Sequence, residues 1–208
     1  MNIQGISSTS SRLSNTERMA ILHESGHALG FLHEHQSPAR SGKLTFNEFV
    51  YEYFRIMEGW SDKVTRDNVT QVVEEREIDN YTEFDTKSIM MYDIPASCNH
   101  QGSTIEPNSE LSEVDKAFAM VHYPRFTPHE KAPEWTIAHA LDVLGVHGTT
   151  RDKILQSYCP KEIYGLFTAW NRERITSCMD TETQSSSAQM HPTNDCDALQ
   201  RWYVPTTL

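Results

Sequence analysis

A chain of 208 residues, of which 38% are hydrophobic, is long enough for one domain or for one domain with an extension. The formal net charge of -11 disfavours a nucleic-acid partner, because a phosphate-binding surface needs concentrated Lys and Arg, and the 18 present are scattered. A membrane partner is also disfavoured, since the chain has no apolar run of about eighteen residues or more. Residues 1–13 are polar and serine-rich and lack the pattern of a signal peptide.

The first predicted helix begins at a polar cap, Ser14 or Asn15, and ends at Gly30. Its apolar positions are expected to form a buried face; these are Met19, Leu22 and Leu29. The helix carries two histidines and one glutamate in the order His-Glu-x-x-His, which makes it the chemically informative segment of the chain.

Three histidines of this segment have the spacing of a catalytic zinc site. His23 and His27 lie four residues apart, so both stand on one face of the helix and can bind one ion. Gly30 enters the left-handed conformation at little cost, which lets the chain turn and bring His33 back as a third ligand. Three protein ligands leave a tetrahedral zinc one open position for water, which is the catalytic pattern.

Glu24 follows the first ligand directly, so its carboxylate is expected beside the metal, where it can accept a proton from the zinc-bound water as a general base. The alternative is that these are ordinary histidines of an amphipathic helix that happen to fall in register. Because five positions are fixed at once, we favour the zinc site. The remaining histidines lack partners at ligand spacing and are expected in the core or in solvent.

Three further segments follow the metal helix. Residues 46–60 carry aromatic side chains at helical spacing and are expected to pack into the core. Ser61 is the predicted cap of a helix that runs to Val73. The pattern around Ser112 predicts a capped helix to Val121, which Pro124 stops.

The last third of the chain predicts three short amphipathic helices over residues 134–144, 150–158 and 160–172, followed by a flexible segment over residues 181–193. We therefore divide the chain into a catalytic region, residues 1–125, and a helical extension with a flexible tail, residues 126–208. The sequence does not indicate an oligomeric state.

Four cysteines, Cys98, Cys159, Cys178 and Cys196, allow up to two disulfides and an oxidising compartment, or free thiols. Their pairing is open. None has the close paired spacing of a structural zinc site, so we do not assign them to metal.

The zinc pattern continues into Glu34 and His35, and it is followed by Ser-Ile-Met-Met-Tyr at residues 88–92. This ordered pair of motifs resembles the astacin family of metzincin zinc endopeptidases, and it is most similar to the fungal and bacterial members. The resemblance implies an α+β, zincin-like (metzincin) fold, one Zn²⁺ per chain, a peptide or protein substrate and secretion. It also implies that Met90 packs beneath the metal. Tyr92 would ligate zinc at rest and swing away to stabilise the oxyanion during turnover.

The sequence departs from the family pattern in two places, and the role of one matching residue is in doubt. Met91 stands where astacins commonly have histidine, which leaves the metal ligands unchanged. Glu34 matches an acidic residue that the family connects to a buried amino terminus, a role that a start at Met1 puts in doubt. Residues 1–22 are too few for the N-terminal sheet that aligns substrate in metzincins, so we expect a mainly helical chain in which this subdomain is truncated.

The leading hypothesis is a zinc-dependent endopeptidase that uses a zinc-activated water, with Glu24 as general base. The alternative is a zinc-binding but catalytically weak or inactive protein, either a fragment or a reduced relative, with a structural or interaction role. A third possibility, another metzincin branch, keeps the metal ligands and predicts no role for Tyr92.

Overall fold

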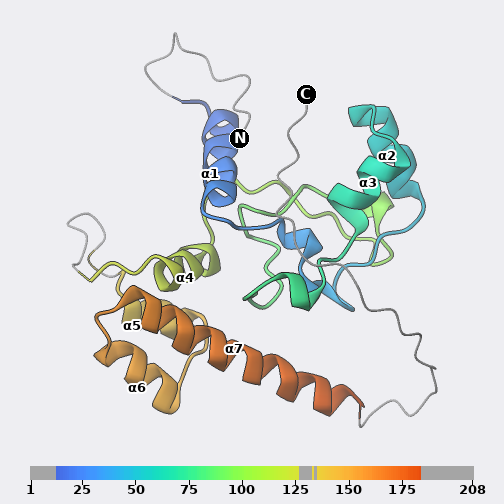
Figure 1. Cartoon of the computed structure of the whole chain (residues 1–208). Coiled ribbons are helices and arrows are strands. Elements are labelled where there is room, and N and C mark those ends of the chain that lie inside the picture. The colour runs from blue at the N-terminus through green and yellow to red at the C-terminus, as the bar shows by residue number, and fades with distance from the viewer. Residues whose placement is uncertain (1–12, 127–132, 134, 184–208) are drawn as a thin grey trace. The chain divides into compact units, whose positions relative to one another are not determined.

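The computed structural model describes residues 13–126, 133 and 135–183, with the side chains of residues 176–183 left out. This part of the chain is mainly helical (Figure 1). Its α-helices are α1 Asn15–Ala28, α2 Phe49–Glu58, α3 Asp62–Thr65, α4 Glu113–His122, α5 Ile137–Val143, α6 Gly148–Gln156 and α7 Pro160–Thr183.

Short helical turns join these helices. The 3-10 turns are η1 Glu34–Gln36, η2 Pro38–Arg40, η4 Glu75–Glu77 and η5 Ala96–Cys98, and η3 Arg66–Thr70 is a π-helical turn. Extended pairing within the described ranges is limited to two isolated antiparallel bridges, Phe46 with Asn99 and Ile94 with Ile105. The expectation of a mainly helical chain is therefore confirmed for these residues. No helix among them combines the length and the apolar character that a membrane span requires.

The chain divides into two compact units, residues 1–174 and residues 175–208. The described part of the second unit is the end of α7. The boundary that we place after residue 125 on sequence grounds remains a prediction.

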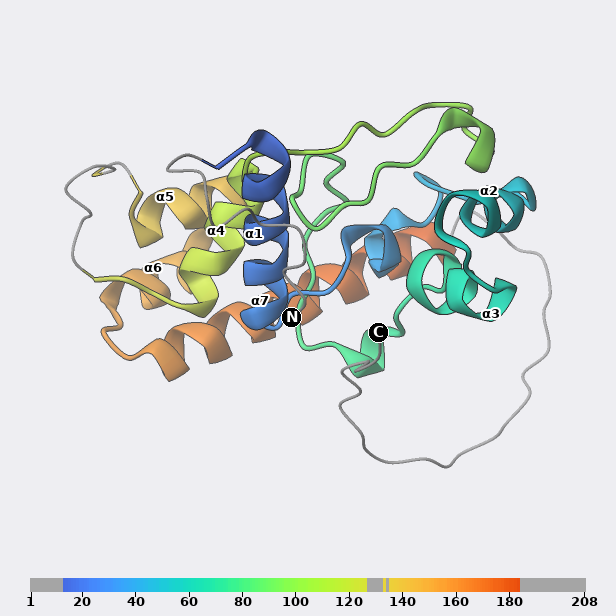
Figure 2. The ribbon, with the colours of Figure 1, turned by 90° about the horizontal axis from the view of Figure 1, so that it is seen from above.

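The first unit contains two hydrophobic clusters. One surrounds α2 and consists of Leu44, Val50, Phe54, Val69, Met91, Ile94, Cys98 and Ile105. The other joins α4 to the three helices that follow it and consists of Ala117, Val121, Ala140, Leu141, Val146, Ile154, Ile163 and Phe167. Figures 1 and 2 show α4, α5, α6 and α7 grouped together, with α2 and α3 apart from them.

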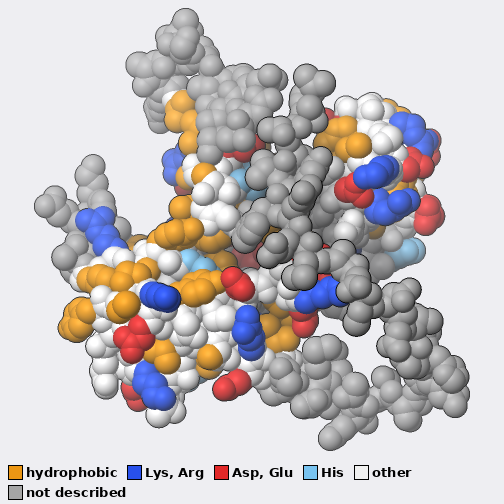
Figure 3. Space-filling model, viewed as in Figure 1, with side chains coloured by type: hydrophobic (Ala, Val, Ile, Leu, Met, Phe, Trp, Pro, Cys, Tyr) orange, Lys and Arg blue, Asp and Glu red, His pale blue; other side chains and the backbone are white. Residues whose placement is uncertain are grey.

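Large hydrophobic side chains also lie on the surface of the helical group. Figure 3 shows them gathered over the region of α4, α5 and α6. Tyr158 is 81% exposed, and Tyr123, Phe126 and Leu155 are also exposed.

Helix α1 begins with a capping box, in which the Ser14 hydroxyl accepts the Glu17 N–H and the Glu17 carboxylate accepts the Ser14 N–H. The helix ends at Ala28, two residues before the predicted end. Leu29 is 41% exposed, so its predicted place on a buried face is wrong. The reason is that Leu29 is the C-cap, where the chain has already left the helix.

Two other predicted helices have different ends. The helix that Ser61 caps leaves helical geometry after Thr70, because the Val73 N–H donates to the carbonyl of Gln36 instead. Helix α7 continues to Thr183, well past the predicted end at 172, since residues 173–183 contain neither Gly nor Pro to stop it. It therefore includes residues 181–183 of the predicted flexible segment, whereas residues 184–193 lie outside the described residues.

Two of the four cysteines can be placed. Cys98 is a buried free thiol and Cys159 is an exposed free thiol. The side chain of Cys178 and the whole of Cys196 lie outside the described residues, so whether these two cysteines form a disulfide stays open.

The one buried residue of α1 is Gly26, and its hydrogen atoms face the side chain of Met90. A Cβ at Gly26 would lie 2.3 Å from the Met90 sulfur, so Gly26→Ala would force this buried methionine to move. We expect the substitution to lower the free energy of unfolding by about 1–3 kcal/mol, the usual cost of overpacking.

Chemical denaturation of the metal-free chain measures this loss. The matched control is Gly165→Ala in α7, where an added Cβ meets nothing within 4 Å and a helix-favouring residue replaces glycine. The control is expected to raise the free energy of unfolding by about 0.4–1 kcal/mol. Equal stability of the two variants would contradict the close packing of Met90 on Gly26.

Candidate metal centre

The end of α1 turns the chain so that three histidines meet. The Gly30 N–H donates to the carbonyl of His27, and the Phe31 N–H donates to the carbonyl of Gly26. Together these two bonds form a Schellman motif, which needs a left-handed residue, and Gly30 has a φ of 85°. The chain leaves the motif toward His33, the N-cap of η1.

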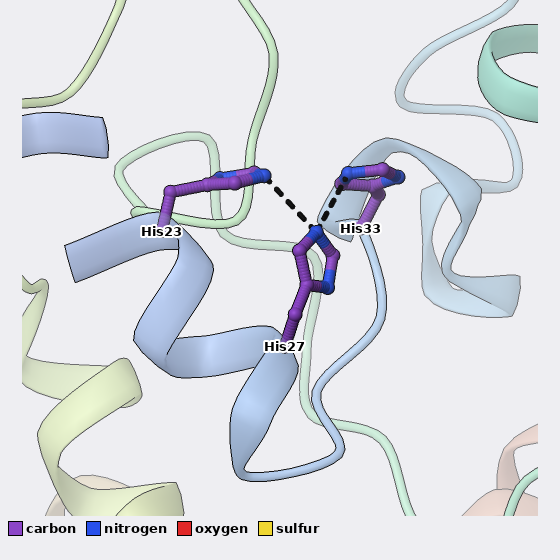
Figure 4. A group of neighbouring side chains, drawn as sticks. All are labelled: His23, His27 and His33. Atoms are coloured by element: carbon purple, nitrogen blue, oxygen red, sulfur yellow. Dashed lines mark hydrogen bonds between the residues drawn. The ribbon is translucent and has the colours of Figure 1, made fainter. Parts of the chain in front are cut away.

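Figure 4 shows the rings of the three histidines pointing at one another. The Nε2 atom of His27 lies 3.1 Å from the Nε2 atom of His23 and 3.1 Å from that of His33. All three candidate ligand atoms lie within 4.8 Å of one another. The structure therefore brings together the three residues that the sequence singles out as metal ligands.

The hydrogen-bond partners of the Nδ1 atoms, which face away from the centre of the group, determine the tautomer of each ring. The Nδ1 atom of His23 lies 2.8 Å from the carbonyl oxygen of Ile89, and that of His27 lies 2.9 Å from the carbonyl oxygen of Phe31. Because a carbonyl oxygen only accepts, each Nδ1 must carry the hydrogen. Each Nε2 then presents a lone pair to the centre of the group.

The Gln36 side chain favours the same tautomer in His33, with the hydrogen on Nδ1. The Gln36 amide nitrogen donates to the carbonyl of Asp67, at 2.8 Å, which turns the amide oxygen toward His33. That oxygen lies 3.3 Å from the Nδ1 atom of His33 and accepts its hydrogen. Gln36 is not among the predicted site residues, and no local motif in the sequence marks it.

Burial disfavours the charged form of two of these rings. Together with the neighbouring histidines it lowers the pKa of His33 to about 2, and it also lowers the pKa of His27. Rings that carry their hydrogen on Nδ1 cannot donate to one another through their Nε2 atoms, so the short distances between these atoms are favourable only around a cation. Three imidazole nitrogens form a donor set that fits zinc.

A turn at residues 88–91 forms the floor of the site. The Met90 side chain packs against α1 at Gly26, between the two ligand positions of that helix. The carbonyl of Ile89 accepts from His23, and the carbonyl of Met90 accepts the N–H of Glu34 at 3.0 Å. The turn thus contacts both segments that supply the histidines.

Tyr92 follows this turn and lines the site. Its ring centroid lies 4.6 Å from that of His33 and 6.1 Å from that of His23. Burial, together with the negative charge of Glu24, raises the pKa of Tyr92 to about 12. At neutral pH the phenol therefore keeps its proton.

Of the two residues that follow the third histidine, His35 is buried and Glu34 is half-buried. The His35 ring stacks on His33 at 5.0 Å between centroids, and its Nε2 atom lies 2.9 Å from the carbonyl oxygen of Asn68, so its expected core role is confirmed. Glu34 accepts the N–H of Asp85 at 2.8 Å, and burial raises the pKa of Glu34 to about 7.

Comparison with known proteins shows a similarity to one peptidase family and to solved structures of myroilysin. The model of the peptidase family described as Astacin matches residues 14–117. A solved structure of myroilysin is 33% identical, with a TM-score of 0.51, and the match covers 56% of this chain and 56% of that chain. A second myroilysin structure is 32% identical, with a TM-score of 0.35, covering 55% and 50%. No curated protein matches. The chain thus spans 56% and 50% of the two myroilysin chains.

The tautomers can be tested by NMR. In the metal-free chain at neutral pH, we expect ¹⁵N shifts that place the hydrogen of His23, His27 and His33 on Nδ1, because each Nδ1 faces an acceptor oxygen. In Gln36→Ala, His33 should lose this preference while the other two keep it, since their acceptors are backbone carbonyls. Hydrogens found on Nε2 of His23 and His27 would contradict the assigned tautomers.

Proposed function

The chain belongs to the astacin family of peptidases, and we propose on this basis that it is a zinc-dependent endopeptidase. The predicted zincin-like (metzincin) fold class agrees with the family match and with the likeness to myroilysin, and it is confirmed. The observation that carries the proposal is the set of three imidazoles whose Nε2 atoms face one another.

In this proposal His23, His27 and His33 hold one Zn²⁺, with Tyr92 as a further ligand at rest. The bound ion would supply Lewis-acid chemistry, which lowers the pKa of a water molecule to about 7 and polarises the scissile carbonyl. The acceptors of the three Nδ1 hydrogens keep the rings oriented, and they increase the basicity of the nitrogens that face the ion.

Glu24 would move the proton. Its carboxylate accepts a proton from the attacking water and delivers that proton to the leaving amine, so that the peptide bond is replaced by an acid and an amine. Tyr92 would donate its phenolic hydrogen to the carbonyl oxygen as negative charge develops there. Its position beside the rings of His33 and His23 supports this role.

The proposed substrate is a peptide or protein, and the proposed location is extracellular. Both come from the family resemblance. The likeness to myroilysin supports the reaction class and leaves the cleavage preference open.

A second candidate function is a zinc-binding protein that is weak or inactive as a peptidase. The observation that favours it is that the described residues form two isolated β-bridges and no strand that could pair with an extended substrate. Since orientation of the substrate supplies a large part of an enzyme's rate, zinc binding and efficient cleavage can be separated.

The zinc site is tested by thermodynamic linkage. Zinc that binds only the folded chain should stabilise it by about 2.7 kcal/mol when free zinc is ~100 times the dissociation constant. His27→Ala removes the ring at the centre of the group and should abolish this gain. The control is His147→Ala, an exposed histidine at the start of α6. Stabilisation by zinc that survives in His27→Ala would place the ion elsewhere.

The role of Glu24 is tested by Glu24→Gln, which keeps the shape of the side chain and removes the base. We expect zinc binding to be unchanged and cleavage of an unfolded protein to fall at least ~100-fold. Glu52→Gln, the same change at an exposed position of α2, is the control and should cleave normally. Wild-type zinc binding without any chelator-sensitive cleavage would favour the second candidate function, and normal turnover in Glu24→Gln would exclude the proposed mechanism.

A further inference from the structure

One carboxylate joins the start of α4 to the floor of the metal centre. The Oδ2 atom of Asp115 accepts the Ser112 N–H at 2.9 Å, as a capping box requires, and it also accepts the Ile89 N–H at 2.8 Å. The Oδ1 atom accepts the hydroxyl of Ser88 at 2.7 Å. Asp115 is thus bonded to two residues that precede it by 26 and 27 positions.

Both backbone polar groups of Ile89 form hydrogen bonds. Its N–H donates to Asp115, while its carbonyl accepts the Nδ1 hydrogen of His23. The same turn is closed by the Met90 N–H, which donates to the Ser88 hydroxyl at 3.0 Å. A shift of this turn would therefore move the acceptor that orients the first histidine.

We propose that Asp115 is a positioning residue of the metal centre, which acts through Ser88 and Ile89 on His23 and does not touch the ion. This proposal rests on the proposed zinc-peptidase function. It deepens that function, because it assigns a role in metal affinity to a carboxylate that the cap pattern marks only as part of a helix cap.

Helix capping alone does not account for the arrangement. A cap needs the Oδ2 bond to the Ser112 N–H and the return bond from the Asp115 N–H to the Ser112 hydroxyl, at 2.9 Å. The bonds to Ser88 and Ile89 are additional, and they use both carboxylate oxygens. An asparagine would offer one accepting oxygen in place of two and no negative charge, so the contact with the Ser88 hydroxyl would have to reverse its direction, with the amide donating and the hydroxyl accepting.

The test measures the zinc dissociation constant by competition with a chromogenic chelator, using the full chain. We expect Asp115→Asn to weaken zinc binding about 10-fold, the lower end of the effect of losing an outer-shell partner. Ser88→Ala removes one bond of the same path and should weaken binding in the same direction. Because both changes break one connection, the double variant should lose less than the product of the two single effects.

Ser112→Ala is the matched control. It breaks the capping box from the other side and leaves the bonds from Asp115 to the turn in place, so it should lower the thermal stability of the metal-free chain without weakening zinc binding. Circular dichroism of each metal-free variant checks the fold. If Asp115→Asn does not fold, the zinc affinity of Ser88→Ala alone tests the role of Asp115.

Unchanged zinc affinity in Ser88→Ala and in any folded Asp115→Asn would overturn the role of Asp115 while the zinc site stands. A loss of affinity in Ser112→Ala equal to that in Asp115→Asn would also overturn it, since general destabilisation would then be the cause. Failure of the wild-type chain to bind zinc would overturn both this role and the proposed function.

Discussion

The contact between the turn at residues 88–91 and helix α1 is the interaction on which the metal centre depends. Helix α1 buries a single residue, Gly26, so it lacks the broad apolar face that usually fixes a helix on a core. Its position relative to the turn is set instead by Met90 packed at Gly26 and by the bond from His23 to Ile89. A few specific contacts therefore fix the position of α1 relative to the turn, whereas many apolar contacts fix the helices of the two hydrophobic clusters.

The electrostatics of the site follow from the same contacts. Each ring nitrogen that faces away from the centre donates to an oxygen, and burial opposes a positive charge on His27 and His33. In the metal-free site three Nε2 lone pairs therefore face one another with no hydrogen between them. A bound cation would remove the repulsion between these lone pairs. Metal binding and the order of these side chains are coupled, because the ion binds the folded arrangement in preference to the unfolded chain.

Local patterns in the sequence were sufficient to predict the parts of this arrangement that depend on nearby residues. The four-residue spacing of His23 and His27, the turn at Gly30 and the cap at Ser112 are all of this kind. The acceptors that orient the rings could not be predicted in this way. Asp115 lies 26 positions from Ile89, and Gln36 is oriented by Asp67, so both depend on how distant segments pack. The cap pattern located Asp115 but did not show that its carboxylate has further partners.

Helix α4 gives the later helices a physical connection to the metal centre. Its first turn carries Asp115, whereas its later turns place Ala117 and Val121 in the cluster with α5, α6 and α7. Phe118 of α4 also contacts Phe31, just after the end of α1, with 5.4 Å between ring centroids. The family match ends at residue 117, within α4, so this helix begins in the matched region and ends outside it. Because α4 packs on α5, the helix that supplies Asp115 also belongs to the core formed with the helices beyond the matched region.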